Sequence, residues 1–435
     1  MKKAALHNLG CKVNAYETEA MQQILENAGY EIVPFTEIAD VYVINTCSVT
    51  NMADRKSRQM FHRAKKMNPD AIVVGAGCYV QTKEAQALVD ESIDIVIGNN
   101  QKHELVTLLN EYEKEHTKQA QIVDINHEKQ EYEELHLKKT AEHTRAFIKV
   151  QDGCNQFCSY CIIPYARGRV RSRELADVLN EVKGLAESGF QEVVLTGIHL
   201  SSYGIDNGGS LLELILKTME VPGIRRVRLG SLEPRIITEE FVNALKDQEK
   251  FCPHFHLSLQ SGCDATLKRM NRRYTAEEYY EKCVLLRENF DHPALTTDVI
   301  VGFPGETEEE FAETVAFLKK VAFYETHIFK YSRRKGTKAA VMENQIPEEL
   351  KTKRSDILLK LDKEHRKEYE AVLVGTEQEV LFEEEVTIDR KDWFVGHTKE
   401  YVKIAVPAEE NLANQLQMVK VSAERAGDLL AGEVR

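Results

Sequence analysis

The segment Cys154-Asn-Gln-Phe-Cys158-Ser-Tyr-Cys161 carries three cysteines within eight residues, in the pattern C-x3-C-x2-C. Three thiolates in one loop can wrap a [4Fe-4S] cluster, and a cluster with only three cysteine ligands keeps one iron open for a substrate. Zinc is the competing metal, but a structural zinc site needs four ligands, and no fourth Cys or His lies close in sequence. Three inert, buried thiols on one short loop are the remaining alternative.

The loop lies near the start of a region, about residues 140–345, in which strand and helix patterns alternate. Apolar strand patterns occupy residues 147–150, 192–195, 226–229, 255–259, 297–301 and 327–331, with helical patterns such as 308–320 between them. Six β/α units predict a partial barrel, short of the eight units of a closed (β/α)8 barrel. A long charged helix over 348–370 is predicted to follow.

The first hundred residues show the same alternation on a smaller sheet. Strand patterns at 4–9, 41–45 and 71–74 are separated by helical patterns, one of them a basic stretch at 51–68. Strands that alternate with helices predict a doubly wound parallel sheet.

A cysteine follows each of these three strands: Cys11, Cys47 and Cys78. The C-terminal ends of parallel strands share one edge of a sheet, so these thiols could converge although they are far apart in sequence. A single cysteine in such a place is more often a buried apolar side chain, but three equivalent places favour a shared site. The other cysteines match no ligand pattern and are interpreted as structural: Cys252, Cys263 and Cys283.

Two further segments complete the predicted organisation. Residues 101–150 contain no Gly or Pro and are densely charged from 111 to 142, which predicts a helix and then an extended connector. Short strand patterns at 380–382, 393–395, 401–406 and 418–421 predict a small all-β barrel. We therefore predict an α/β chain in four parts: an N-terminal doubly wound domain (1–115), a charged linker (116–139), a partial-barrel core (140–370) and a C-terminal β domain (371–435).

The composition is that of a globular protein, with 43% hydrophobic and 29% charged residues in 435. It excludes collagen-like, disordered and disulfide-scaffold proteins. The most apolar run, 71–80, has about half of the ~20 residues needed to cross a bilayer, and no apolar stretch of the secretory kind follows Lys2 and Lys3. We expect a cytoplasmic protein without a membrane partner, in which the cysteines serve metal binding, catalysis or burial.

The charge pattern gives mixed evidence on nucleic acid. The net charge of −13 argues weakly against a nucleic-acid partner. Basic residues nevertheless cluster near the predicted barrel mouth, and four alternating arginines after the cysteine loop would share one face of an extended segment. The candidate phosphate or carboxylate contacts are Arg167, Arg169, Arg171, Arg173, Arg225, Arg226, Arg228, Arg235, Lys268, Arg269, Arg272, Arg273, Lys330, Arg333, Arg334, Lys335 and Lys338.

The C-x3-C-x2-C spacing resembles that of the radical S-adenosylmethionine (SAM) enzymes, and the resemblance extends over residues 140–345. It implies that the open iron chelates SAM and that an electron from the cluster cleaves SAM to methionine and a 5′-deoxyadenosyl radical. Tyr160 would lie near the adenine of SAM. The other candidate SAM contacts lie at or near the C-terminal ends of successive strands, where α/β sites form: Thr196, Gly197, Ser231, Glu233, Gln260, Asp298 and Gly302. Of these, Glu233 and Asp298 are candidate SAM contacts or proton acceptors.

The whole chain resembles the radical SAM methylthiotransferases, which join an N-terminal domain, a radical SAM core and a C-terminal module called TRAM. The resemblance assigns Cys11, Cys47 and Cys78 to a second [4Fe-4S] cluster, beside the first on Cys154, Cys158 and Cys161. The motifs Leu-Gly-Cys-Lys-Val-Asn (9–14) and Asn-Thr-Cys-Ser-Val-Thr (45–50) resemble the threonylcarbamoyladenosine branch, the MtaB type.

This branch implies methylthiolation of C2 of N6-threonylcarbamoyladenosine at position 37 of tRNA. The radical would abstract the C2 hydrogen, and a sulfur carried on the second cluster and methylated by another SAM would be transferred to C2. The implied partners are tRNA and an electron donor such as a flavodoxin or ferredoxin. The TRAM module is expected to bind RNA, although the chain has 14 acidic and 7 basic residues from Glu370 onward.

Two alternatives remain open from the sequence. One is the same chemistry on isopentenyladenosine in tRNA or on ribosomal protein S12. The other is a protein without enzymatic activity, which binds RNA through a zinc ion or cluster and senses iron or oxidants.

Overall fold

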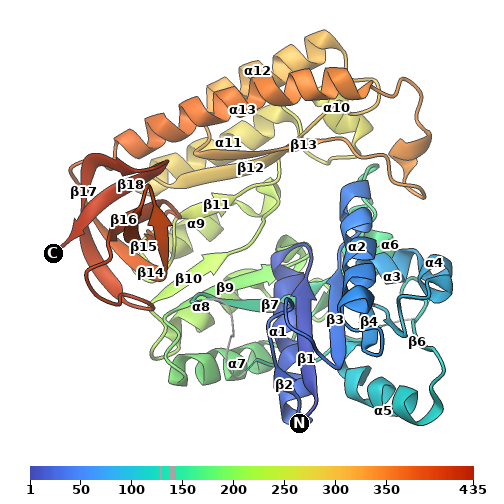
Figure 1. Ribbon diagram of the computed structural model, residues 1–435. Coiled ribbons are helices and arrows are strands. Elements are labelled where there is room, and N and C mark those ends of the chain that lie inside the picture. The colour runs from blue at the N-terminus through green and yellow to red at the C-terminus, as the bar shows by residue number, and fades with distance from the viewer. Residues whose placement is uncertain (128–129, 138–143) are drawn as a thin grey trace.

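The computed structural model describes residues 1–127, 130–137 and 144–435 and contains three bodies: an N-terminal domain, a central core and a C-terminal β-barrel (Figure 1). The N-terminal domain and the C-terminal β-barrel both border the open side of the central partial barrel. The predicted architecture is confirmed: a parallel N-terminal sheet, a partial (β/α)6 barrel and a small closed β-barrel.

The N-terminal domain is a parallel sheet of order β2-β1-β3-β4-β5-β6 with helices on its faces. The strands are β1 Lys3–Asn8, β2 Glu31–Ile32, β3 Val41–Thr46, β4 Ile72–Gly77, β5 Ile95–Ile97 and β6 Gln119–Gln121. The helices are α1 Lys12–Asn27, α2 Asn51–Met67, α3 Cys78–Thr82, α4 Glu84–Val89 and α5 Leu105–Glu115. The three expected strands are β1, β3 and β4, and they lie side by side in the middle of the sheet.

The charge pattern predicts an extended linker over 116–139, but the described part of this stretch contains a strand and buried side chains. Its first part supplies β6, which pairs in parallel with β5. Further along, Leu135 and Leu137 are buried against Tyr16 and Ala20 of α1. The composition of this stretch is dominated by charged residues, so it does not reveal that these few apolar side chains are buried. The predicted segment 138–139 lies outside the described residues.

In the described part of the core, six parallel strands form two groups, β10-β9-β7 and β11-β12-β13, joined by the isolated bridges Val227–Phe251 and Leu232–Leu257. The short β8 pairs antiparallel to β7 at the outer edge. The strands are β7 Ala146–Asp152, β8 Arg171–Ser172, β9 Glu192–Gly197, β10 Arg226–Leu229, β11 His254–His256, β12 Ala294–Val301 and β13 Glu325–Lys330. The helices are α6 Ile163–Arg167, α7 Leu175–Glu187, α8 Leu211–Glu220, α9 Glu239–Leu245, α10 Asp264–Arg269, α11 Ala276–Asn289, α12 Glu308–Val321 and α13 Glu348–Ala371.

The C-terminal domain is a closed barrel of order β14-β15-β16-β18-β17. Its strands are β14 Glu377–Ile388, β15 Lys391–His397, β16 Lys403–Pro407, β17 Leu416–Ala426 and β18 Leu429–Val434. Its apolar interior continues onto the core, because Ala294 and Tyr324 belong to the same buried cluster as Phe382 and Phe394. This shared cluster fixes the barrel beside the core strands.

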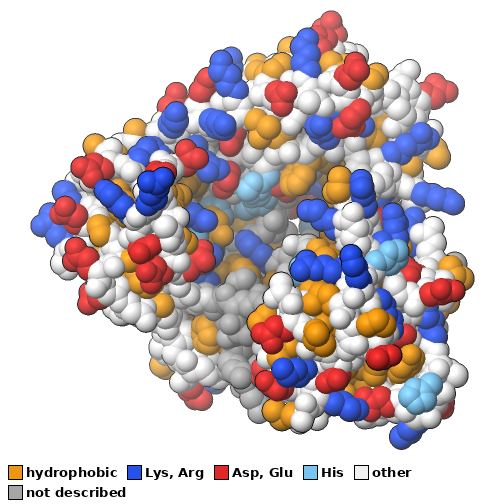
Figure 2. All heavy atoms as spheres, in the orientation of Figure 1, with side chains coloured by type: hydrophobic (Ala, Val, Ile, Leu, Met, Phe, Trp, Pro, Cys, Tyr) orange, Lys and Arg blue, Asp and Glu red, His pale blue; other side chains and the backbone are white. Residues whose placement is uncertain are grey.

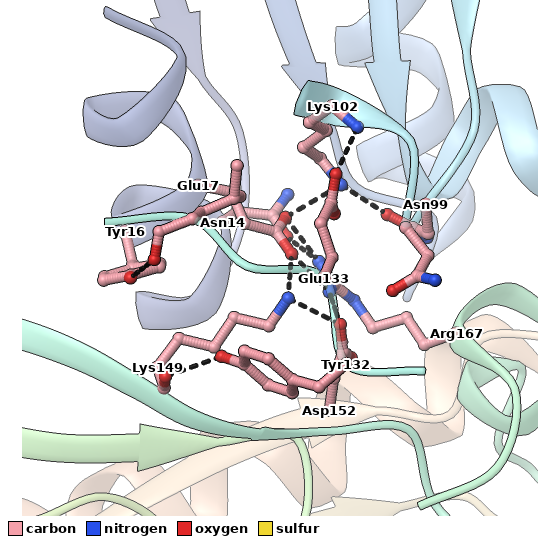
Figure 3. Close-up of polar contacts among 12 residues, drawn as sticks. Asn14, Tyr16, Glu17, Asn99, Lys102, Tyr132, Glu133, Lys149, Asp152 and Arg167 are labelled. Carbon is pink, nitrogen blue, oxygen red and sulfur yellow. Dashed lines mark hydrogen bonds and ion pairs between the residues drawn. The ribbon is translucent and has the colours of Figure 1, made fainter. Parts of the chain in front are cut away.

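A buried network of charges joins the N-terminal domain to the core (Figure 3). Glu17 of α1 is fully buried and accepts from three cations: Lys149 of β7 (Nζ–Oε1, 2.8 Å), Arg167 of α6 (Nη1–Oε1, 2.8 Å) and Lys102 (Nζ–Oε2, 3.2 Å). Asp152 at the end of β7 accepts from Lys149 at 2.6 Å and from Arg167 at 3.1 Å. Buried ions are tolerated only when paired and hydrogen-bonded, so this network ties α1 to β7 and α6.

Candidate active site

The second cysteine set meets at one edge of the N-terminal sheet, as its positions after β1, β3 and β4 predict. Gly10 lies so close to the loop of Cys47 that an added Cβ would be 3.0 Å from the Cβ of Cys47. Burial and the neighbouring Cys78 thiol raise the pKa of Cys47 to about 12. Burial also raises the pKa of the Cys11 thiol, and Arg167 offsets that effect only in part. Three clustered thiols are a donor set that an iron–sulfur cluster fits, with loss of their protons on binding.

Asn14 and Asn99 form hydrogen bonds around the second cysteine set. Asn14 donates to the carbonyls of Leu9 (2.7 Å) and Thr46 (2.9 Å), which precede the two cysteine loops, and accepts from Arg167 (2.7 Å). Asn99 donates to the sulfur of Cys78 at 3.5 Å and to the carbonyl of Ala166 at 2.8 Å. Asn99 therefore links the second set to α6, the helix that follows the first set.

The first cysteine set lies on the loop between β7 and α6. Burial raises the pKa of Cys154 to about 11, and burial together with the neighbouring Cys158 thiol raises that of Cys161 to about 12. Arg272 donates to the sulfur of Cys158 at 3.3 Å, and the backbone N–H of Gln156 donates to that of Cys154 at 3.5 Å. Such hydrogen bonds to sulfur are the ones that tune bound clusters.

The two sets border two adjoining cavities, together called the hollow, which Figure 2 shows between the three bodies. The larger part is a cavity of about 1000 Å³ with Cys11 in its wall, and the smaller part, about 250 Å³, has Cys161 in its wall. The two parts share Val49, Ile163 and Asp298. A group in the shared space can therefore be reached from either cysteine set.

Most of the predicted SAM contacts lie around this hollow. Thr196, Gly197, Ser231 and Asp298 line the larger part, and Tyr160, Gln260 and Asp298 line the smaller part. Glu233 borders neither part, but its carboxylate accepts from Gln156 of the cysteine loop at 3.4 Å and lies 3.7 Å from His199. Gly302 lies elsewhere: its backbone packs against Lys351, 2.3 Å from an added Cβ to Cγ. Of the eight candidates, Glu233 and Gly302 are the two that line neither part of the hollow.

The sequence analysis predicted Asp298 at this site but missed the two histidines beside it. His256, Asp298 and His327 come from the adjacent strands β11, β12 and β13, and one ligand atom of each lies within 4.8 Å of the others. Burial would raise the pKa of Asp298, but its hydrogen bond to His256 lowers it, so the carboxylate is ionised at neutral pH. The two histidines lie at strand positions that face the hollow. The alternation of His and Phe in β11 is the only feature of the sequence that could have indicated this placement.

Tyr401 of the β-barrel also enters the larger cavity, from the turn between β15 and β16. Its ring stacks between those of His254 (4.8 Å between centroids) and His397 (4.5 Å). Arg145 and Arg228 each lie 4.9 Å from the ring centre, and Lys12 lies 5.9 Å from it. No local sequence pattern predicts that Tyr401 lines the cavity, because its neighbours come from all three bodies.

The prediction that alternating arginines line a nucleic-acid groove is wrong for most of them. Arg167, Arg171 and Arg173 are buried, as are Arg226, Arg228 and Arg334. Their guanidinium groups bond inside the protein: Arg173 to Glu181, Arg228 to Glu192 at 2.7 Å, and Arg334 to Asp54 at 2.8 Å. Arginine alternation marks one face of a segment but does not say whether that face meets water or buried carboxylates.

Exposed basic residues instead gather on α2 and the loop after β13. α2 presents Arg55, Lys56, Arg58, Arg63 and Lys66 to solvent, and the loop presents Arg333, Lys335 and Lys338. The two segments touch, because the amide of Asn51 donates to the Ser332 hydroxyl at 3.1 Å. Figure 2 shows Lys and Arg side chains on this side of the hollow. The acidic chain therefore has a local basic surface.

Comparisons with known proteins agree with this geometry. Residues 148–318 match the radical SAM superfamily, and residues 3–98 match the uncharacterized protein family UPF0004. Threonylcarbamoyladenosine tRNA methylthiotransferase MtaB of Bacillus subtilis is 41% identical over 97% of this chain and 94% of the relative. The chain belongs to the radical SAM methylthiotransferase family. It is an MtaB-type member, and the radical SAM match implies SAM and a [4Fe-4S] cluster as cofactors.

Other relatives of this methylthiotransferase span both nucleoside branches. MtaB of Aquifex aeolicus is 44% identical, covering 88% of this chain and 93% of the relative. The tRNA-2-methylthio-N(6)-dimethylallyladenosine synthase of Acetivibrio thermocellus is 35% identical over 100% of this chain and 91% of the relative. Among solved structures, the radical SAM methyltransferase TsrM of Kitasatospora setae has a TM-score of 0.57 at 18% identity, over 78% and 74% of the two chains, which shows a common fold. Among the described residues, no helix has the length and apolar character that crossing a membrane requires.

Proposed function

We propose that this enzyme methylthiolates C2 of N6-threonylcarbamoyladenosine at position 37 of tRNA, with two [4Fe-4S] clusters. The observation that carries the proposal is that the cavity bordered by Cys11 and the cavity bordered by Cys161 adjoin and share part of their walls. A reaction that needs a radical and a sulfur at the same carbon requires two centres that reach one space. The MtaB relatives support the substrate, at 41% and 44% identity against 35% for the dimethylallyladenosine enzyme.

Six cysteines of the chain would hold the two clusters. When bound, the first cluster and SAM supply a 5′-deoxyadenosyl radical, and the second cluster supplies the sulfur. Arg272 hydrogen-bonds the Cys158 sulfur, and Asp298 offers an ionised carboxylate where the two parts of the hollow join. The β-barrel, through Tyr401, His397 and Glu383, closes one wall and limits the entry of water.

The basic surface of α2 and the loop after β13 supports tRNA as the partner. Lysine and arginine contacts to phosphate position a nucleic acid without reading its sequence. Placed beside the hollow, this surface can hold the anticodon arm while the target base enters. We further propose a small electron-transfer protein, such as a flavodoxin or ferredoxin, as the reductant.

The test is the iron and acid-labile sulfide content of anaerobically reconstituted protein, followed by a tRNA assay. We expect about eight irons per chain in the wild type, as two four-iron clusters require. Replacing either cysteine triad with alanine should leave about four. Wild-type protein with SAM and dithionite should then convert threonylcarbamoyladenosine in an anticodon-arm RNA to its 2-methylthio derivative, detected by mass spectrometry of nucleosides.

Two results would count against the proposal. Four irons in the wild type and none after loss of the first triad would mean that Cys11, Cys47 and Cys78 hold no cluster. Conversion of isopentenyladenosine RNA, or of ribosomal protein S12, in preference to the threonylcarbamoyl RNA would keep the chemistry and replace the substrate.

A further inference from the structure

Lys12 is a lysine in the cavity wall without a carboxylate partner. It begins α1 directly after Cys11 and lines the larger part of the hollow. Within the described part of the chain, no carboxylate oxygen lies within ion-pair distance of its ammonium, and its contact there is the Tyr401 ring, 5.9 Å from the nitrogen to the ring centre. Lys12 is partly buried, and a charge drawn out of bulk water without a partner is costly, which points to an anionic ligand.

Of the three described cations around the Tyr401 ring, Arg145 and Arg228 are already paired with carboxylates, so Lys12 is the one left to bind an anion. Arg145 makes a two-pronged pair with Glu383, from Nε to Oε1 at 3.0 Å and from Nη2 to Oε2 at 3.2 Å. Arg228 pairs with Glu192 at 2.7 Å. These pairs hold the walls in place and keep their guanidinium groups beside Tyr401.

The potential at this corner is nevertheless positive. Burial alone would raise the pKa of the Tyr401 phenol, but Arg145 and Lys12 lower it. Tyr401 has a left-handed backbone (φ 73°), an uncommon conformation for a residue of its size, and its ring is fixed between two histidine rings. The corner thus combines a rigid aromatic face with a free ammonium.

We propose that Lys12, flanked by Tyr401 and Arg145, binds the carboxylate of an amino-acid group on N6 of the target adenine. The inference rests on the proposed function and names its specificity determinant. In adenine, N1 lies between C2 and C6, and C6 carries the N6 substituent, so C2 and this substituent lie on the same edge of the base. A base that presents C2 toward Cys11 therefore turns its N6 substituent toward the same wall, where Lys12 is the next residue along the chain.

The experiment compares three anticodon-arm RNAs that differ only at N6 of the target base. One carries the threonylcarbamoyl group, one carries its primary amide in place of the carboxylate, and one carries no substituent. Binding is measured by fluorescence anisotropy and product by nucleoside mass spectrometry. We expect wild-type protein to bind the acid about ten- to a hundredfold more tightly than the amide, the range of a charge-assisted contact.

Three variants separate recognition from other roles of Lys12. Lys12→Gln should bind acid and amide equally while keeping the wild-type iron content, and Lys12→Arg should retain the preference for the acid. Lys399→Gln is the matched control, because Lys399 lies on the same turn as Tyr401 but donates to the Glu249 carbonyl (2.7 Å). It should behave as the wild type.

Other outcomes overturn the assignment. A preference for the acid that survives in Lys12→Gln would show that another group binds the carboxylate. Equal weakening toward all three RNAs, or loss of about four irons, would show a role in the cluster site. Wild-type protein that modifies acid and amide equally would reject the subsite and keep the proposed function, whereas wild-type protein that modifies neither would reject both.

Discussion

His397 shows how one buried side chain links stability to pH. Burial lowers its pKa to about 4, although its hydrogen bond to Glu383 opposes this, and Arg145 and Arg228 lower it further. The unfolded value is about 6.5, so between pH 4 and 6.5 the unfolded chain binds a proton that the folded chain does not. Stability from this residue is therefore complete above pH 6.5 and is lost as the pH falls toward 4, by roughly 3 kcal/mol in all.

The measurement is denaturant unfolding of wild type and His397→Gln at pH 7.5 and pH 5. We expect the wild type to lose more stability on acidification than the variant. His254, which burial also keeps neutral, still titrates in the variant, so a reduced loss is expected rather than none. Identical losses in the two proteins would assign the pH dependence to other groups.

Side chains differed greatly in how far the sequence could predict them. Cys154, Cys158 and Cys161 were predictable because their spacing is local. Lys12 and Tyr401 were not, since their meeting depends on how three bodies pack. Arg226 and Arg228 were misinterpreted for a related reason: their carboxylate partners, such as Glu192 and Glu379, lie on other strands.

The turn between β4 and α3 depends on Gly77, which immediately precedes Cys78. Its φ is +90°, and an added Cβ would lie 2.5 Å from Oδ1 of Asn45 and 3.0 Å from the carbonyl of Thr46. Asn45 is held by its own donation to Asn14 at 3.0 Å and cannot move away freely. Gly77→Ala should cost roughly 2–4 kcal/mol, from backbone strain and crowding together.

The readouts for Gly77→Ala are the free energy of unfolding and the iron content after reconstitution. The strained turn should also lower iron loading toward four per chain, because Cys78 would be displaced. Gly29→Ala is the control: its φ is +88°, but nothing lies within 4 Å of an added Cβ. It should cost only about 1–2 kcal/mol and leave iron unchanged. Equal effects of the two changes would contradict the crowding argument.

Helices and strands were predictable in proportion to their length. The long α2 and α13 and the central strands β3 and β4 agree with the sequence patterns. The short strands β2, β5 and β6 were not predicted, because two or three residues are too few to show a period. Their place in the sheet comes from pairing with longer neighbours.

The three bodies meet through polar groups as well as apolar ones, and a buried polar network docks the N-terminal domain. The network around Glu17 (Figure 3) connects α1, which follows Cys11, with α6, which follows Cys161. Arg167 also donates to Asn14, which holds two of the three loops of the second cysteine set. The same contacts that dock the domain therefore fix one cysteine set relative to the other, a geometry that no single segment encodes.

Glu17→Gln tests this docking, since it keeps the shape of the side chain and removes the charge that three buried cations share. Breaking one side of a buried ion network typically costs about 3–5 kcal/mol, because the remaining charges stay out of water without compensation. We expect that loss in denaturant unfolding, together with slower SAM-dependent product formation as the two cysteine sets lose their fixed separation. Lys217→Gln removes an exposed pair with Glu220 and should change stability by less than about 0.5 kcal/mol. A Glu17→Gln protein as stable as this control would mean that apolar contacts alone dock the domain, and that the charges around Glu17 do not stabilise the interface.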